Sequence, residues 1–229
     1  MKNANLYDNQ DEIFKSLLPL YRKLNIENHF NKDIDYLKKA FEGMETLWFK
    51  NIKNIKKLNM ILICEAPLWG ENKQYFYNPE TPHSQFIYCN DFNFKNNIEF
   101  NIKTKENLIN HCNELGMLII DVSPFALNNL TEINYGKLKS SDYKSIIINT
   151  LENYFFKKID FLINKTDIQI NSRINIVYRY KRVQKALSNL IEHDIKNKFK
   201  LDKNYAFDCI VQSGGGIDKN KLEKLINKI

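Results

Sequence analysis

The sequence predicts an α/β fold, a three-layer α/β/α sandwich built around a central four-stranded, mainly parallel sheet. Three observations support this prediction: four short apolar runs, longer stretches in which apolar residues recur every three or four positions, and the alternation of the two along the chain. Strands that alternate with helices form a parallel sheet covered on both faces. With 229 residues, 43% of them hydrophobic, the chain can bury the core of a single domain, which we expect to span residues 1–229.

We expect residues 1–57 to form N-terminal helices and residues 58–217 to form the core. Within residues 34–55, apolar side chains recur with the spacing of a long amphipathic helix. Gly116 stands at the C-cap position of a shorter helix, and Asp218 is a suitable N-cap for the last one. Together with the long helix, the predicted helices are those of residues 106–115, 143–162, 183–199 and 218–228.

Four runs have the composition of strands. The first contains four consecutive apolar or small residues before Glu65, as expected of a strand that is buried on both faces. Pro67 stops this strand, so Glu65 lies at its carboxyl end, the edge of an open α/β sheet where ligands bind. The second strand ends similarly, in Asp121 ahead of Pro124. The four predicted strands are Met60–Glu65, Met117–Val122, Ile174–Tyr180 and Phe207–Gln212.

The two carboxylates and a glycine run are the candidate functional elements, although each also has a structural interpretation. Glu65 could serve only as a helix cap or an ion-pair partner, and an aspartate placed like Asp121 commonly caps a helix. The segment Ser213–Gly216 precedes the last helix, where free backbone N–H groups could hold a phosphate. The same glycines could instead form only a tight turn.

Composition limits the classes of partner and cofactor. The formal net charge of +7 and the pI near 9.0 favour a polyanion such as DNA. The chain contains no run of 18 uncharged apolar residues, and its start has no apolar signal segment, so we expect a cytoplasmic protein without a membrane span. Its four cysteines and four histidines show no metal-ligand spacing, so we expect no metal and no cofactor. We also expect a monomer.

Three segments, in order, resemble the uracil-DNA glycosylase superfamily over residues 58–217. One strand ends in Glu65-Ala66-Pro67, like the Gly-Glu-Ala-Pro-Gly motif of some members, and the aromatic cluster Tyr75-Phe76-Tyr77 follows. The second strand ends in Asp121-Val122-Ser123-Pro124, a polar residue before a proline, and a loop follows the fourth strand. The match is best with divergent bacterial members, in which an aromatic pair follows Glu-Ala-Pro or Glu-Ser-Pro.

The sequence also departs from the superfamily pattern. Cys64 and Leu68 replace the two glycines of the first motif, and Asp121 replaces the asparagine that reads uracil in many members. The segment Ser213–Gly216 stands where a His-Pro-Ser motif usually follows the fourth strand. Paired cysteines for an iron–sulfur cluster are missing. These departures argue against ordinary uracil excision rather than against the fold.

The resemblance implies a DNA glycosylase, a hydrolase that cleaves the N-glycosidic bond of a flipped base in DNA repair or phage defence. It assigns catalysis to Glu65, which would stabilise positive charge on the sugar and orient a water. The base would stack on Phe76, with Tyr77 and Tyr75 behind it, and Asp121 would read its edge. Arg179 and Arg182 could equally belong to a solvated helix start. The implied contacts to DNA phosphates are Ser213, Gly214, Gly215, Gly216, Lys73, Arg179 and Arg182.

The aspartate at position 121 limits the range of bases that the site is expected to recognise. An ionised aspartate only accepts hydrogen bonds, so it suits the N4 amine of cytosine and repels O4 of uracil. We therefore expect a damaged or modified base with an exocyclic amine, such as a cytosine derivative. A protonated Asp121, held neutral by burial near Glu65, would instead restore the recognition of uracil.

Two other functions fit the sequence. A catalytically inactive nucleic-acid-binding module of the same fold would explain the missing histidine, which assists the leaving base in many superfamily members. A small-molecule α/β hydrolase or nucleotide-binding protein would use Gly214–Gly216 as a phosphate loop. The nucleophile-elbow, Walker and dinucleotide-binding motifs that usually mark such proteins are missing from the chain.

Overall fold

The structure, a computed structural model, describes residues 6–7, 9–82, 87–92, 102–212 and 215–228. Over these residues the chain has an α/β fold with a four-stranded sheet, and all of its strand pairs are parallel. The predicted fold class is thereby confirmed at this level. The strand order is β2-β1-β3-β4. The strands are β1 (Lys57–Cys64), β2 (Met117–Asp121), β3 (Gln169–Tyr178) and β4 (Asp208–Cys209).

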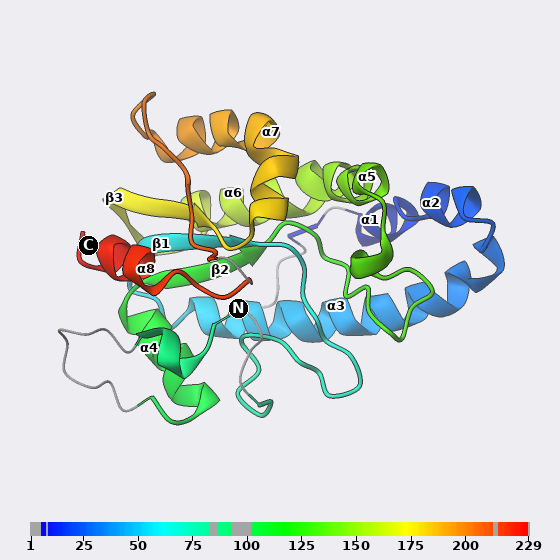
Figure 1. The fold of residues 1–229 in the computed structure, drawn as a ribbon, viewed down its shortest axis with the longest axis horizontal. Coiled ribbons are helices and arrows are strands. Elements are labelled where there is room, and N and C mark those ends of the chain that lie inside the picture. Colours follow the sequence, from blue (N-terminus) through cyan, green and yellow to red (C-terminus); the bar gives the residue numbers. More distant parts are fainter. Residues whose placement is uncertain (1–5, 8, 83–86, 93–101, 213–214, 229) are drawn as a thin grey trace.

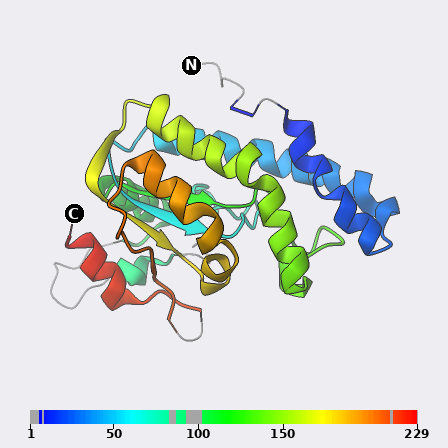
Figure 2. The same cartoon turned by 90° about the horizontal axis from the view of Figure 1, so that it is seen from above.

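Helices cover both faces of the sheet. The α-helices of the described residues are α1 (Gln10–Lys15), α2 (Leu18–Lys23), α3 (Phe30–Ile52), α4 (Lys105–Glu114), α5 (Ser140–Thr150), α6 (Phe156–Asn164), α7 (Lys181–Phe199) and α8 (Lys219–Ile226). α3 and α4 lie on one face, whereas α5, α6 and α7 lie on the other (Figure 1). α6 and α7 run over the sheet side by side, and α1 and α2 pack against the beginning of α3 (Figure 2). In the part of the chain that the structure describes, no helix is long and apolar enough to cross a membrane.

Two of the predicted helix ends are found where the sequence placed them. The Asp218 side chain caps α8 by accepting a hydrogen bond from the Lys221 backbone N–H at 3.1 Å. Gly116 follows α4 with a left-handed φ of +67°, and a Cβ there would lie 2.1 Å from the Lys57 carbonyl oxygen. Glycine is therefore required at the turn between α4 and β2.

The long apolar stripe at residues 143–162 is divided rather than continuous. A π-helical turn, Leu151–Phe155, separates α5 from α6. A π-turn adds a residue to one helical turn, so it rotates the following helix face. The apolar periodicity alone did not indicate this interruption, because its spacing of three and four residues accommodates the extra residue.

α3 is anchored to the sheet through its buried face, in which apolar residues recur every three or four positions. The indole N–H of Trp48 donates a hydrogen bond to the Ile119 carbonyl oxygen of β2 at 3.1 Å. On the same helix, a Cβ at Gly43 would lie 2.4 Å from the ring of Trp69. The absent side chain at Gly43 thus lets the loop that follows β1 pack directly on α3. The buried apolar residues of this face are Ile34, Leu37, Ala40, Phe41, Met44, Trp48 and Ile52.

The register of the sheet brings the carboxyl ends of three strands to one edge. Cys64 of β1 lies opposite Asp121 of β2, and Ile63 lies opposite Tyr178 of β3. The order of the strands reverses at β1, since β2 lies on one side of it and β3 on the other. In open α/β sheets, a crevice forms outside the carboxyl ends at such a reversal.

β3 and β4 differ most from the predicted strands. β3 begins five residues earlier than predicted, with a half-exposed polar segment that starts at Gln169, and β4 contains only two residues. β4 pairs with Val177 and Tyr178 alone. Further back along β3, the Tyr205 hydroxyl accepts a hydrogen bond from the Ile176 N–H at 2.6 Å and donates one to the Ile174 carbonyl at 3.2 Å.

Candidate active site at the carboxyl edge of the sheet

Backbone hydrogen bonds hold the two predicted carboxylates beside one another. Beyond the regular strands, the Val122 N–H donates to the Cys64 carbonyl at 3.0 Å, and the Ser123 N–H donates to the Glu65 carbonyl at 3.1 Å. The ladder between the first two strands therefore continues past their ends. Glu65 and Asp121 lie at the same edge, as the sequence predicts.

Glu65 is partly buried at this edge, with 24% of its side chain exposed. An Nη atom of Arg182 lies 3.7 Å from its carboxylate. Burial raises the pKa of Glu65 above its ordinary value, whereas the Tyr143 hydroxyl and Arg182 act in the opposite direction. A carboxylate that remains accessible while its basicity is increased is suited to accept a proton.

Asp121 is almost fully buried, at 3% exposure, and its Oδ1 atom has no hydrogen-bond partner among the described residues. Burial raises the pKa of Asp121 to about 7, Lys158 opposes this shift, and the negative charges of Glu45 and Glu65 add to it. Asp121 therefore titrates near neutral pH. Both forms considered from the sequence, the accepting carboxylate and the donating acid, are accessible to it.

A buried ion pair lies close enough to Asp121 to affect its pKa: Lys158 lowers that pKa and Glu45 raises it. The Lys158 ammonium of α6 lies 2.6 Å from the Glu45 carboxylate of α3, and the Tyr7 hydroxyl donates to the same carboxylate at 2.6 Å. Lys158 also donates to the Tyr154 hydroxyl at 2.9 Å and lies 4.4 Å from the centre of the Trp48 ring. This cluster was not predicted from the sequence. Its signal was a lysine at an inward position of the apolar stripe, four residues after Tyr154.

Tyr143 and Arg182 are two further neighbours of Glu65. The guanidinium of Arg182 stacks 3.8 Å from the centre of the Tyr143 ring, and both of its Nη atoms donate to the Tyr135 carbonyl at 3.2 Å. The Tyr135 hydroxyl is in turn 2.6 Å from the Ser123 hydroxyl. The Tyr143 hydroxyl is buried, has no hydrogen bond of regular geometry to a described residue, and interacts with the Glu65 carboxylate. Sequence reasoning missed Tyr143 because it counted the residue only as part of an apolar helix face.

The predicted base-stacking rings belong to the core in this structure. Phe76 is 1% exposed and Tyr77 is 3% exposed, and the two rings pack edge to face at 4.9 Å. The Tyr77 hydroxyl accepts a hydrogen bond from the Ile119 backbone N–H at 2.7 Å. A base could stack on Phe76 only after this packing opened. Tyr75, predicted behind them, is also buried.

Tyr180 is a more accessible ring at the same edge. It is half-buried, lies two residues after the end of β3, and carries the Arg179 guanidinium 4.5 Å from its ring centre. Burial and the neighbouring Cys64 thiol raise the pKa of Tyr180, and Glu65 and Asp121 contribute in the same direction. Tyr180 thus lies near enough to the two carboxylates to interact with them electrostatically. In the sequence it was assigned only to the end of the third strand.

The predicted phosphate contacts are distributed unequally. Arg179 is 2% exposed, and both of its Nη atoms donate to the Gly215 carbonyl at 3.2 Å, so it holds the loop after β4 against the end of β3. Gly216 continues that loop, and its carbonyl accepts from the Gln212 N–H at 2.9 Å. Lys73 is exposed in the turn after β1, and Arg182 is half-exposed beside Glu65. Ser213 and Gly214 lie outside the described residues.

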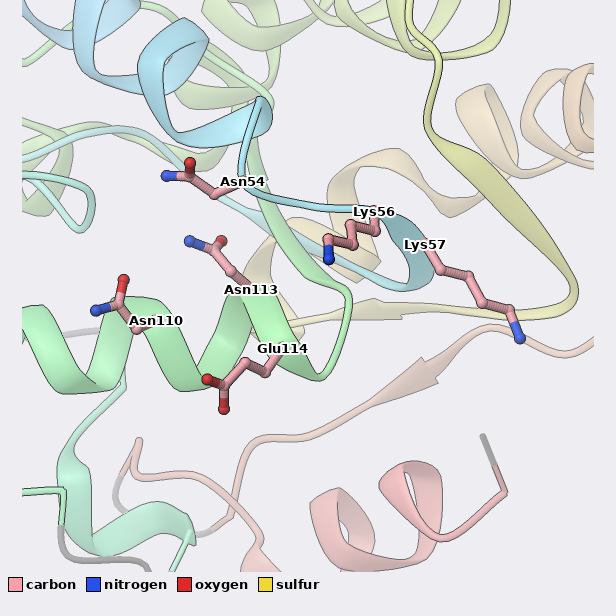
Figure 3. A pocket seen from close by; sticks show the side chains of 6 residues that line it. All are labelled: Asn54, Lys56, Lys57, Asn110, Asn113 and Glu114. Carbon is pink, nitrogen blue, oxygen red and sulfur yellow. The ribbon is translucent and has the colours of Figure 1, made fainter.

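A separate pocket of about 410 Å³ opens at the opposite edge of the sheet (Figure 3). It lies between the start of β1 and α4, and one of its walls is fixed by reciprocal amide hydrogen bonds between Asn51 and Asn113 at 3.0 and 2.9 Å. The two carboxylates do not border it. Its lining residues are Asn54, Lys56, Lys57, Asn110, Asn113 and Glu114.

The described residues contain no cluster of three or more histidine, cysteine, aspartate or glutamate side chains that could hold a metal ion. Comparison with known proteins adds no assignment: no protein-family model, curated protein or solved structure matches this chain. The function must therefore be inferred from the chemistry at the carboxyl edge, where Glu65, Asp121, Tyr143, Tyr180 and Arg182 converge.

Proposed function

We propose that this protein is a DNA N-glycosylase with a uracil-DNA-glycosylase-like fold, which hydrolyses the bond between deoxyribose and a flipped damaged or modified base. The order of its motifs, the parallel sheet and the placement of Glu65 at the strand reversal support the proposal. Its basic net charge suits a DNA partner.

One observation carries the proposal. Among the described residues, Asp121 Oδ1 and the Tyr143 hydroxyl are the buried side-chain oxygens without a hydrogen bond of regular geometry, and both groups interact with Glu65. Buried polar atoms are nearly always paired in folded proteins, and exceptions concentrate at sites of chemistry. Two such atoms that both interact with one carboxylate support a reaction site at the carboxyl edge rather than a structural ion pair.

The proposed chemistry uses Glu65 as the carboxylate that faces the sugar. As the C1′–N bond breaks, its electron pair stays on the base nitrogen and positive charge develops on C1′ and the ring oxygen. The Glu65 carboxylate stabilises that charge and accepts a proton from the water that attacks C1′. The base anion takes its proton from solvent or from a protonated Asp121.

The substrate must enter as a flipped nucleotide. Extrusion of a base from the duplex costs a few kcal/mol, and stacking on an aromatic ring returns about 1–3 kcal/mol. Tyr180 offers a partly accessible ring beside the carboxylates, and Phe76 would contribute only if the loop after β1 rearranged. Lys73 and Arg182 keep enough exposed surface to contact phosphates.

Alkali treatment of end-labelled oligonucleotides tests the activity. Single- and double-stranded DNA carrying uracil, cytosine or modified cytosine is incubated with the wild-type protein, Glu65→Gln and Glu71→Gln. Glu71 is an exposed carboxylate in the following turn and serves as the matched control. We expect alkali-labile sites with the wild type and Glu71→Gln, and a loss of roughly 100-fold or more with Glu65→Gln, the range seen when one group that stabilises transition-state charge is removed.

The same experiment separates the alternatives. Equal DNA binding by all three proteins without strand cleavage would favour the inactive nucleic-acid-binding module. Cleavage that persists in Glu65→Gln would refute the role of this carboxylate. For the choice of base, uracil release that is equal in wild type and Asp121→Asn would refute a preference for an exocyclic amine set by Asp121.

A further inference from the structure

We propose that Tyr143 is a positioning residue for Glu65: its hydroxyl interacts with the Glu65 carboxylate in the free protein and also bonds the attacking water once substrate is bound. This inference rests on the proposed glycosylase function and names a residue that neither the motifs nor the resemblance singled out.

The geometry supports a role that depends on the hydroxyl. The Tyr143 ring is held on one face by the Arg182 guanidinium at 3.8 Å and at its edge by the Tyr135 ring at 6.2 Å. The ring is therefore fixed by packing, and the buried hydroxyl, which has no hydrogen bond of regular geometry, interacts with the Glu65 carboxylate. A fixed, buried hydroxyl whose interaction partner is a reactive carboxylate is placed to act on that carboxylate during the reaction.

Arg182 ties the two groups together. Its guanidinium lies 3.7 Å from the Glu65 carboxylate and stacks on Tyr143, while both of its Nη atoms are also held by the Tyr135 carbonyl. Glu65 and Tyr143 thus share Arg182 as a neighbour, and this residue is held in place as part of α7. A water between them would donate one proton to each oxygen, which points its lone pair away from both groups and toward the sugar.

The Tyr143 hydroxyl also sets the protonation of Glu65. Its interaction lowers the pKa of Glu65 against the effect of burial, so removal of the hydroxyl raises that pKa. The acid limb of the activity profile, which follows the ionisation of Glu65, should then move to higher pH. The titratable or charged groups that face Glu65 from the surrounding elements are Cys64, Asp121, Tyr135, Tyr143, Tyr180 and Arg182.

The test is Tyr143→Phe, which keeps the ring and removes only the hydroxyl. Tyr178→Phe is the matched control, because Tyr178 is similarly buried but its hydroxyl donates to Glu192 of α7 rather than interacting with Glu65. For Tyr143→Phe we expect kcat to fall about 10- to 100-fold with KM unchanged, and the acid limb to move to higher pH. Tyr178→Phe should leave both unchanged.

A second measurement does not depend on activity. In protein labelled with ¹³C-glutamate, the Glu65 carboxyl signal is identified by its loss in Glu65→Gln and is titrated in the wild type and in Tyr143→Phe. We expect the Glu65 pKa to be higher in the variant.

The outcomes distinguish the two proposals. A wild-type protein that releases no base would overturn the glycosylase function, whatever the titration shows. An active wild type whose kcat, acid limb and Glu65 titration are all unchanged in Tyr143→Phe would overturn the role of Tyr143 alone. A fall in kcat/KM for Tyr143→Phe without a shift of the acid limb would show that Tyr143 contributes through packing alone. That result would also overturn its role as a positioning residue.

Discussion

Replacement of Asp121 by asparagine should change the pH dependence of stability. Folding raises the pKa of this carboxyl from its ordinary 3.8 to about 7, chiefly through burial. Between those values the folded protein binds a proton that the unfolded chain has released. The free energy of unfolding of the wild type therefore falls as the pH rises from 3.8 to about 7. Asparagine does not titrate, so Asp121→Asn should not show this decrease.

The magnitude follows from the two pKa values. Their difference corresponds to about 4 kcal/mol once the pH exceeds 7, because each tenfold change in proton affinity is worth about 1.4 kcal/mol. At pH 5 the unfolded chain is already mostly ionised, so roughly 2–3 kcal/mol of this penalty develops between pH 5 and pH 8. Solvent screening removes little of it, since Asp121 is buried. Between pH 5 and pH 8, the free energy of unfolding of Asp121→Asn should therefore rise by that amount relative to that of the wild type.

The assay is urea unfolding, followed by circular dichroism at several pH values between 5 and 8 and at constant ionic strength. Asp35→Asn, on the exposed side of α3, is the matched control, and its difference from the wild type should stay constant. Comparison across pH cancels the cost of placing an amide at position 121. A stability difference between Asp121→Asn and wild type that is the same at pH 5 and pH 8 would refute a pKa raised by burial.

Three further predictions concern packing and binding. Lys158→Met should lower the free energy of unfolding by about 3–5 kcal/mol in urea, because Glu45 stays buried without its partner, and adding Glu45→Gln should restore part of the loss. Gly43→Ala should destabilise by about 1–3 kcal/mol despite the better helix propensity of alanine, since its Cβ would displace the Trp69 ring, and calorimetry should show a Tm lower by several degrees. Tyr180→Leu should weaken single-stranded DNA binding by about 1–3 kcal/mol in fluorescence anisotropy, and unchanged affinity would argue against stacking on this ring.

How closely the predicted strands match the observed ones depends on how deeply each strand is buried. β1 and β2 are covered on both faces, so continuous apolar runs predicted their positions within a few residues. The first half of β3 is polar and half-exposed, and its pairing with β1 is interrupted by an irregularity between Leu58 and Met60. No local pattern predicts a strand that is defined mainly by its neighbour.

The site was predictable in part for the same reason. The positions of Glu65 and Asp121 follow from strand ends, which local sequence marks with proline. The choice of Phe76 rested on residue type, and an aromatic side chain is as common in a core as on a binding surface. Tyr143 and Lys158 come from helices on one face of the sheet, so their approach to the carboxylates depends on tertiary packing that a linear pattern does not encode.

The hydroxyl of Tyr205 has a consequence for how copies of this protein behave toward one another. A strand whose outer backbone groups are unpaired is a template on which a second chain can add a strand of its own. At Ile174 and Ile176 of β3, where β4 has already ended, the phenol takes both the outward carbonyl and the outward N–H. A single side chain thus takes the place of the missing strand at this point of β3, and a second copy of the chain would have to displace the phenol before it could add a strand there.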